Sequence, residues 1–219
     1  MKKTGLLFLG VIFIMAGINT NPVFAKKKIS AEKILKKVRE RVQSINTLQA
    51  SFKETFHWTM IDEVQKFSGE LYIGEGDKFR LQTAGQIIVS DGKTLWTYDA
   101  GKNQVLIDNV SPSGDELLPR RLLLKFEKDY HPTLIGKKVI GTTMCYVLDL
   151  TSKTEDAFIP KMTVWIDSKN WLTKKLSYED INQNKTTYEL GSIKINKKLP
   201  EEIFRFKIKP GVQVIDMRN

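Results

Sequence analysis

Hydrophobic residues recur at helical spacing shortly after Ser30. The apolar positions are Ile34, Leu35, Val38, Val42 and Ile45. This spacing predicts an amphipathic helix, with the Ser30 side chain capping its first turn. The opposite face carries Lys33, Lys36, Lys37, Arg39 and Arg41. We interpret these cations as a solvated face, with docking to phospholipid headgroups or an acidic partner as the alternative.

From residue 48 the hydrophobic period changes to two, which predicts strands. Residues 48–58 place Phe52, Phe56 and Trp58 on one face, together with Glu54. Short strands separated by Gly, Asp and Asn turns continue along the chain to a last strand at 204–208. The count is about eleven, which favours an antiparallel sandwich or barrel of the mainly β, α+β class. Residues 111–132 break the pattern, and their leucines among charges predict one or two short helices.

The stretch "IIVSDGKTLWTYD" (87–99) contains Gly92-Lys93-Thr94, which raises the question of a phosphate-binding loop. Such a loop needs a glycine five positions before Gly92, where the chain has Ile87. The flanking segments also alternate as strands. We therefore predict a β-hairpin with Asp91-Gly92 at its tip, in a type I′ turn.

Residues 1–25 have the features of a cleaved secretory signal peptide. Lys2 and Lys3 precede an apolar run, and Val23 and Ala25 are the small residues before the cleavage point. An uncleaved membrane anchor is the alternative. Residues 26–219 are expected to form a single domain, because their length suits one sizeable core.

The net charge indicates which partners the protein would bind, and the cysteine count shows whether a disulfide can stabilise the fold. The formal net charge is +10, and removal of Lys2 and Lys3 leaves 10 − 2 = +8. An exported basic protein is expected to favour membranes or acidic partners and not nucleic acid. Cys145 is the single cysteine, so no internal disulfide can form. Its apolar surroundings predict a buried structural thiol.

The sequence gives little support for enzymatic chemistry. His57 and His131 are the only histidines, and neither has a partner at a metal-ligand spacing. No Gly-x-Ser-x-Gly motif is present, and most aspartates fall in turns. We therefore expect no enzyme, no metal and no cofactor. The abundant strand aromatics predict either a filled core or an apolar hollow for a hydrocarbon ligand, and periodicity does not separate the two.

Four segments in order resemble the LolA family of periplasmic lipoprotein carriers. They are "LQASFKE", "KFRL", "IIVSDGKTLWTYD" and "KPGVQVID". The resemblance implies an unclosed antiparallel β-barrel covered by a helical lid. It also implies a monomeric periplasmic carrier that takes acylated lipoproteins from an inner-membrane ABC transporter of the Lol type to an outer-membrane acceptor, without catalysis.

The resemblance also suggests which residues would hold the acyl chains. The expected cavity wall is Phe52, Phe56, Leu71, Ile73, Phe79, Trp96 and Leu176, and the expected lid is Leu117, Leu118, Leu122 and Leu123. Family members often carry a basic lid latch where this chain has Glu75, so Arg80 is the nearest candidate for that role. Two other functions use the same fold: binding of free lipid or glycolipid, and a sensor or regulatory interaction.

Overall fold

The predicted N-terminal helix is α1 (Ala31–Gln43) in the computed structural model, which describes residues 29–110 and 128–218. Ser30 has extended backbone angles, and its side-chain oxygen accepts a hydrogen bond from the Lys33 amide at 3.2 Å. This bond satisfies one of the free amides of the first turn and so fixes where the helix begins. The expected apolar stripe is buried.

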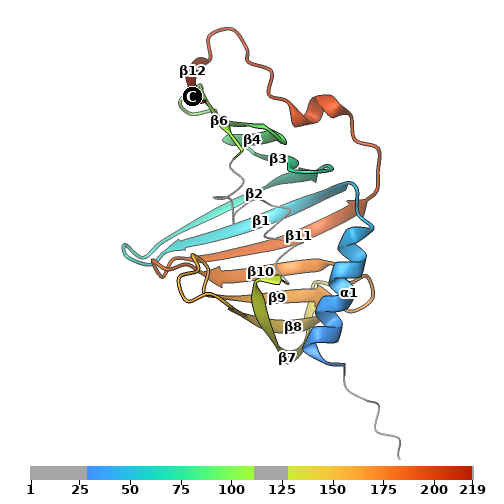
Figure 1. Ribbon diagram of the computed structural model, residues 1–219. Coiled ribbons are helices and arrows are strands. Elements are labelled where there is room, and N and C mark those ends of the chain that lie inside the picture. The colour runs from blue at the N-terminus through green and yellow to red at the C-terminus, as the bar shows by residue number, and fades with distance from the viewer. Residues whose placement is uncertain (1–28, 111–127, 219) are drawn as a thin grey trace, which may run out of the picture.

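Twelve strands within the described residues form one sheet (Figure 1). In chain order they are β1 (Leu48–Trp58), β2 (Glu63–Ile73), β3 (Lys78–Thr83), β4 (Gln86–Asp91), β5 (Thr94–Asp99), β6 (Gln104–Asn109), β7 (Tyr130–Ile140), β8 (Thr143–Ser152), β9 (Lys161–Asp167), β10 (Thr173–Glu179), β11 (Lys185–Ile195) and β12 (Gln213–Asp216). The prediction of a mainly β fold is confirmed. The expected lid helices of 111–132 lie largely outside the described residues, and residues 130–132 belong to β7.

The sheet is open, as predicted. Its strand order is β12-β6-β5-β4-β3-β2-β1-β11-β10-β9-β8-β7, so β12 and β7 are the edge strands among the described residues. Neighbouring strands are antiparallel except for β12, which pairs parallel to β6. The antiparallel expectation does not hold for this pair. The chain after β11 crosses the sheet and starts β12 at the edge where β6 also starts, so the two strands run in the same direction (Figure 1).

The main core lies between α1 and one side of the sheet, which we call the inner face. Residues of α1 such as Ile34 and Val38 belong to one buried cluster with residues of β1, β2 and β8–β11, including Leu71 and Leu176. Across β1 and β2, Leu48 pairs with Ile73 and Ala50 with Leu71 on this face. The opposite side is the outer face.

A second, smaller core lies on the outer face of β3–β6. Val89, Val105 and Ile107 are buried but do not belong to the main cluster. The chain after β11 covers them with η2, a 3₁₀ helix (Glu201–Phe204), whose Phe204 is also buried. The prediction of a strand at 204–208 is therefore wrong. This segment crosses the outer face, and the strand forms later, as β12.

The β4–β5 connection is a hairpin, as predicted, but its turn is closed differently. Gly92 has a φ of 95°, whereas Asp91 is not among the described residues with positive φ, so the turn is not type I′. Instead the Asp91 carboxylate accepts hydrogen bonds from the Lys93 and Thr94 amides at 3.0 and 2.9 Å. This is the local bonding by which aspartate commonly closes turns.

Cys145 is buried, in agreement with the sequence. Burial raises the pKa of its thiol to about 11, and the nearby Asp167 carboxylate adds to that rise. The thiol is therefore protonated and unreactive at neutral pH. Within the described part of the chain, no helix combines the length and apolar character needed to span a bilayer.

Candidate functional site

The inner face near β1 is built from large apolar side chains packed over a glycine. Phe52 pairs with Gly69 of β2, and its ring lies 3.1 Å from where a Cβ would stand at position 69. The same Cβ would lie only 1.9 Å from the Gln82 carbonyl oxygen. Position 69 therefore requires glycine, and its missing side chain leaves room for the Phe52 ring, which is buried.

The inner face continues across β3–β6 as a row of apolar residues. Leu81 pairs with Ile88, Ile88 with Thr97, and Thr97 with Leu106, so these side chains lie side by side on one face. Leu95 lies in the adjacent row. We call Leu81, Ile88, Leu95 and Leu106 the apolar belt; all four are half-buried. The belt is thus less enclosed than the core beneath α1.

The structure brings most of the predicted wall residues together on the inner face. Leu71, Ile73, Phe79 and Leu176 are buried there with Phe52, and Phe56 is half-buried. The predicted lid residues Leu117, Leu118, Leu122 and Leu123 lie outside the described residues. Whether any of these side chains contacts a ligand stays a prediction.

Trp96 and Arg80 both lie on the outer face, and for Trp96 this differs from the prediction. Arg80 pairs with Val89 and Val89 with Trp96, which puts all three on the outer face. The Arg80 guanidinium donates to the Ile203 carbonyl at 3.4 Å and to the Gln82 side chain at 3.1 Å. Burial lowers the pKa of Arg80. The Ile203 contact holds the C-terminal segment, and the expectation of Trp96 at the inner cavity is corrected. The role of Arg80 as a lid latch stays a prediction, because the expected lid lies outside the described residues.

One polar pair on the inner face was not anticipated as functional. Glu54 lies between Phe52 and Phe56 in β1, and its carboxylate accepts a hydrogen bond from the Tyr188 hydroxyl at 2.9 Å. Burial raises the pKa of Glu54, and the bond from Tyr188 only partly offsets that rise. The signal was visible in the sequence, because Glu54 shares the apolar face of the 48–58 alternation. It places a hydrogen-bonded carboxylate among the aromatic side chains of the inner face.

The raised pKa of Glu54 makes a pH-dependent contribution to stability. A carboxyl group whose folded-state pKa exceeds its unfolded value stabilises the fold at low pH, and this contribution is lost as pH rises through the folded pKa. Glu54→Gln keeps an acceptor for Tyr188 and removes the charge. We expect its melting temperature, relative to wild type, to rise as the pH increases above about 4, near the pKa of an unfolded glutamate.

Thermal unfolding followed by circular dichroism across this range provides the measurement. Glu189→Gln is the matched control, since Glu189 is exposed on the outer face of β11. A Glu54→Gln variant whose melting temperature follows wild type at every pH would show that Glu54 is solvated in the native protein.

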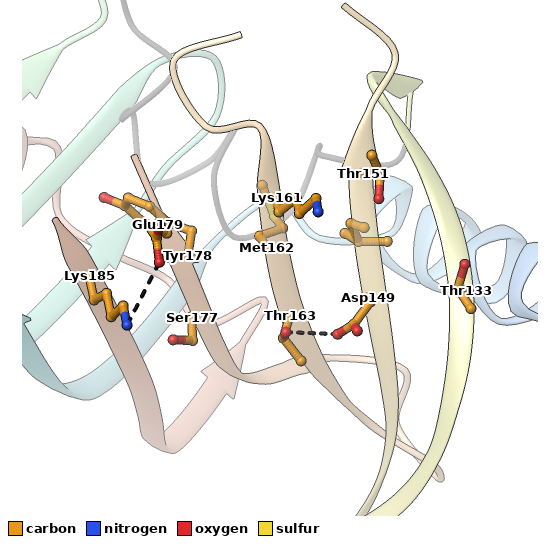
Figure 2. Close-up of a pocket in the computed structure, with 11 residues that line it drawn as sticks. Thr133, Asp149, Thr151, Lys161, Met162, Thr163, Ser177, Tyr178, Glu179 and Lys185 are labelled. Atoms are coloured by element: carbon orange, nitrogen blue, oxygen red, sulfur yellow. Dashed lines mark hydrogen bonds and ion pairs between the residues drawn. The ribbon is translucent and has the colours of Figure 1, made fainter. Parts of the chain in front are cut away.

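The outer face of β7–β11 contains a separate polar pocket of about 500 Å³ (Figure 2). Small hydroxyl residues of successive strands, Thr133, Thr163 and Ser177, contribute to its lining together with Asp149. Thr163 donates to Asp149 at 2.8 Å, and Lys185 lies 3.8 Å from Glu179. Asp149, Lys185 and Glu179 thus form hydrogen bonds or ion pairs with their neighbours in the pocket, which is typical of a solvated sheet face.

The described residues show no arrangement suited to a metal. Across residues 29–110 and 128–218, no cluster of three or more His, Cys, Asp or Glu side chains could hold an ion. His57 lies at the β1–β2 turn, where its Nε2 is 2.8 Å from Asp62, a residue with an exposed side chain. In the part of the chain described, the distinctive surface is therefore the apolar inner face.

Comparison with known proteins identifies a family and its fold. Residues 43–207 match the family model described as outer membrane lipoprotein carrier protein LolA. The outer-membrane lipoprotein carrier protein of Legionella pneumophila is 29% identical over 81% of this chain and 87% of its own length. That of Haemophilus influenzae is 27% identical over the full length of both chains.

More distant relatives show how widely the fold is used. An uncharacterized protein of Methanocaldococcus jannaschii is 24% identical over 86% of this chain, which spans only 55% of that protein. An uncharacterized conserved protein of Thermus thermophilus has a TM-score of 0.55 at 18% identity, over 85% of this chain and 98% of that one. MucB has a TM-score of 0.50 at 15% identity, over 81% of this chain and 62% of MucB.

Proposed function

The chain belongs to the LolA family, and on that premise we propose that it binds the acyl chains of lipoproteins on the inner face of its open sheet. The relatives named as outer-membrane lipoprotein carriers match more than four-fifths of the chain, which supports this assignment. The protein is then a carrier that releases its cargo unchanged.

The apolar belt is the observation that carries the proposal. The outer side of β3–β6 is covered by the C-terminal segment, with Val89 and Ile107 buried. On the inner side of the same strands, Leu81, Ile88, Leu95 and Leu106 remain half-buried. A surface of leucine and isoleucine that is incompletely covered suits a hydrocarbon ligand.

Partial enclosure also suits release. Burying each methylene contributes about 0.8 kcal/mol, so a fully buried chain of about 16 carbons would gain roughly 12 kcal/mol. Two or three fully buried chains would reach the limit of noncovalent affinity, near −20 kcal/mol. A belt that covers the chains only in part lowers this gain and allows transfer to an acceptor.

The wider pathway belongs to the same proposal. Residues 1–25 direct export to the periplasm and are removed, and residues 26–219 act there as a monomeric single-domain carrier. Cargo arrives from an inner-membrane ABC transporter and leaves to an outer-membrane acceptor. The names of the relatives support the direction of this transfer.

Native mass spectrometry of the mature protein, purified gently from the periplasm, tests the proposal. We expect a co-purifying species that resolves into an acylated protein. Free phospholipid or glycolipid in its place would support a lipid-binding function. An empty protein that also fails to take up a fluorescent fatty acid would contradict acyl binding and favour a sensor.

A further inference from the structure

Two turns at one end of the sheet carry exposed apolar residues where turns usually carry Gly, Asn, Asp or Ser. In the β1–β2 turn, at 59–62, Met60 is 86% exposed and Ile61 is 55% exposed. In the β10–β11 turn, at 180–184, Ile181 is 59% exposed. Because none of the three is buried against the protein, folding does not explain them.

The two turns lie side by side and are held in fixed conformations. The Thr59 hydroxyl donates to the Gln183 carbonyl at 2.7 Å, which joins one turn to the other. The Asp180 carboxylate accepts from the amides of Asn182 and Asn184 at 2.8 and 3.0 Å. We call residues 59–62 and 180–184 the tip. The β1–β2 turn projects from the end of the sheet (Figure 1).

Apolar residues surround the base of the tip on both faces of the hairpin. Trp58 continues the inner-face row of β1, and Val64 pairs with His57 on the outer face; both are exposed. A protein partner covers one side of a hairpin, whereas lipid surrounds an inserted tip on every side. From this distribution we propose that the tip inserts into a lipid bilayer, with Met60, Ile61 and Ile181 reaching the hydrocarbon and Trp58 at the interface.

The charges near the tip are compatible with insertion. Asp62 lies 2.8 Å from His57, Glu179 lies 3.8 Å from Lys185, and Glu63 accepts from the Gln65 amide at 2.8 Å. Each of these carboxylates therefore has a local hydrogen-bond or ion-pair partner. The mature chain, with a net charge of 10 − 2 = +8, is attracted to a bilayer that contains anionic lipid.

Insertion does not depend on the acyl-binding function, although the two would cooperate. Phe56 and Phe67 lie on the inner face between the tip and Phe52, so aromatic side chains occur along this face from the tip to the candidate site, with Glu54 and Gln65 among them. Vesicle binding and fatty-acid binding are separate measurements, and either can fail while the other succeeds.

The test uses flotation of the mature protein with vesicles of phosphatidylethanolamine and phosphatidylglycerol. Replacing Met60 and Ile61 together with serine is expected to lower the vesicle-bound fraction about tenfold, because both apolar side chains are lost. The matched control replaces Ile135 and Val139 of β7 with serine. These residues are 59% and 53% exposed but lie away from the tip, and we expect binding to be unchanged.

A fluorescent label reports where the tip resides. Met60→Cys can be labelled selectively with a polarity-sensitive dye, because Cys145 is buried and the pKa of its thiol is about 11. Vesicles should shift the dye emission to the blue. The proposal is overturned if the double serine variant binds vesicles as strongly as wild type. It is also overturned if the dye emission of the vesicle-bound protein stays at the wavelength seen in water. The latter result would mean electrostatic adsorption only.

Discussion

Phe204→Ala is expected to lower the free energy of unfolding by about 3 to 5 kcal/mol, the range for truncating a buried aromatic residue. Phe204 is 3% exposed, and a Cβ built at Gly74 would lie 2.9 Å from its ring. The ring thus fills the space left by a glycine at the end of β2. Its loss would open the outer core and weaken the attachment of the C-terminal segment.

Equilibrium unfolding in urea measures this effect. Ile208→Ala is the matched control, because Ile208 lies in the same segment but is 43% exposed. Its change should stay within about 0.5 kcal/mol. If the two variants are equally stable, the C-terminal segment is only loosely attached and the outer core contributes little.

Ile88→Glu is expected to weaken binding of a fluorescent fatty acid by at least about tenfold, which corresponds to 1.4 kcal/mol. Ile88 lies in the middle of the apolar belt, where it pairs with Leu81 and Thr97. An ionised carboxylate at this position would have to be desolvated beneath an acyl chain, with no partner for its charge. Fluorescence titration of the folded variant gives the affinity.

The neighbouring residue supplies the control. Ile87 has the same side chain and is also half-buried, but its partners Gln82 and Tyr98 place it on the outer face. Ile87→Glu should therefore keep its affinity per folded molecule even if it loses some stability. Equal loss of binding in both variants would contradict a site on the inner face.

Local patterns in the sequence predicted much of this fold. Ser30 and the spacing from Ile34 to Val42 located α1, and the alternation in 48–58 identified β1 and its buried face. In both cases one face of the element is apolar and the other polar, so periodicity reports which side is buried.

The same reasoning fails in β3–β6, where both faces of the sheet carry apolar side chains. The sequence Ile87-Ile88-Val89 is apolar throughout, as is Val105-Leu106-Ile107. Such strands have no period-two signal, so the sequence could not show that Trp96, in the strand between them, faces outward. Likewise, "FRFKI" alternates like a strand, but its Phe204 belongs to a 3₁₀ helix and is buried in the outer core.

The strand order has a consequence for how the protein assembles. β1–β6 and β7–β11 are two runs in which each strand pairs with the next along the chain, so most contacts within each run are local. In the sheet formed by the described residues, the two runs are joined by the pairing of β1 with β11, as at Phe52 and Leu190. Local hairpins form quickly, whereas pairing between distant segments must first close a long loop. The β1–β11 pair should therefore limit the folding rate, and the sheet cannot be completed until β11, close to the C-terminal end of the sequence, is available.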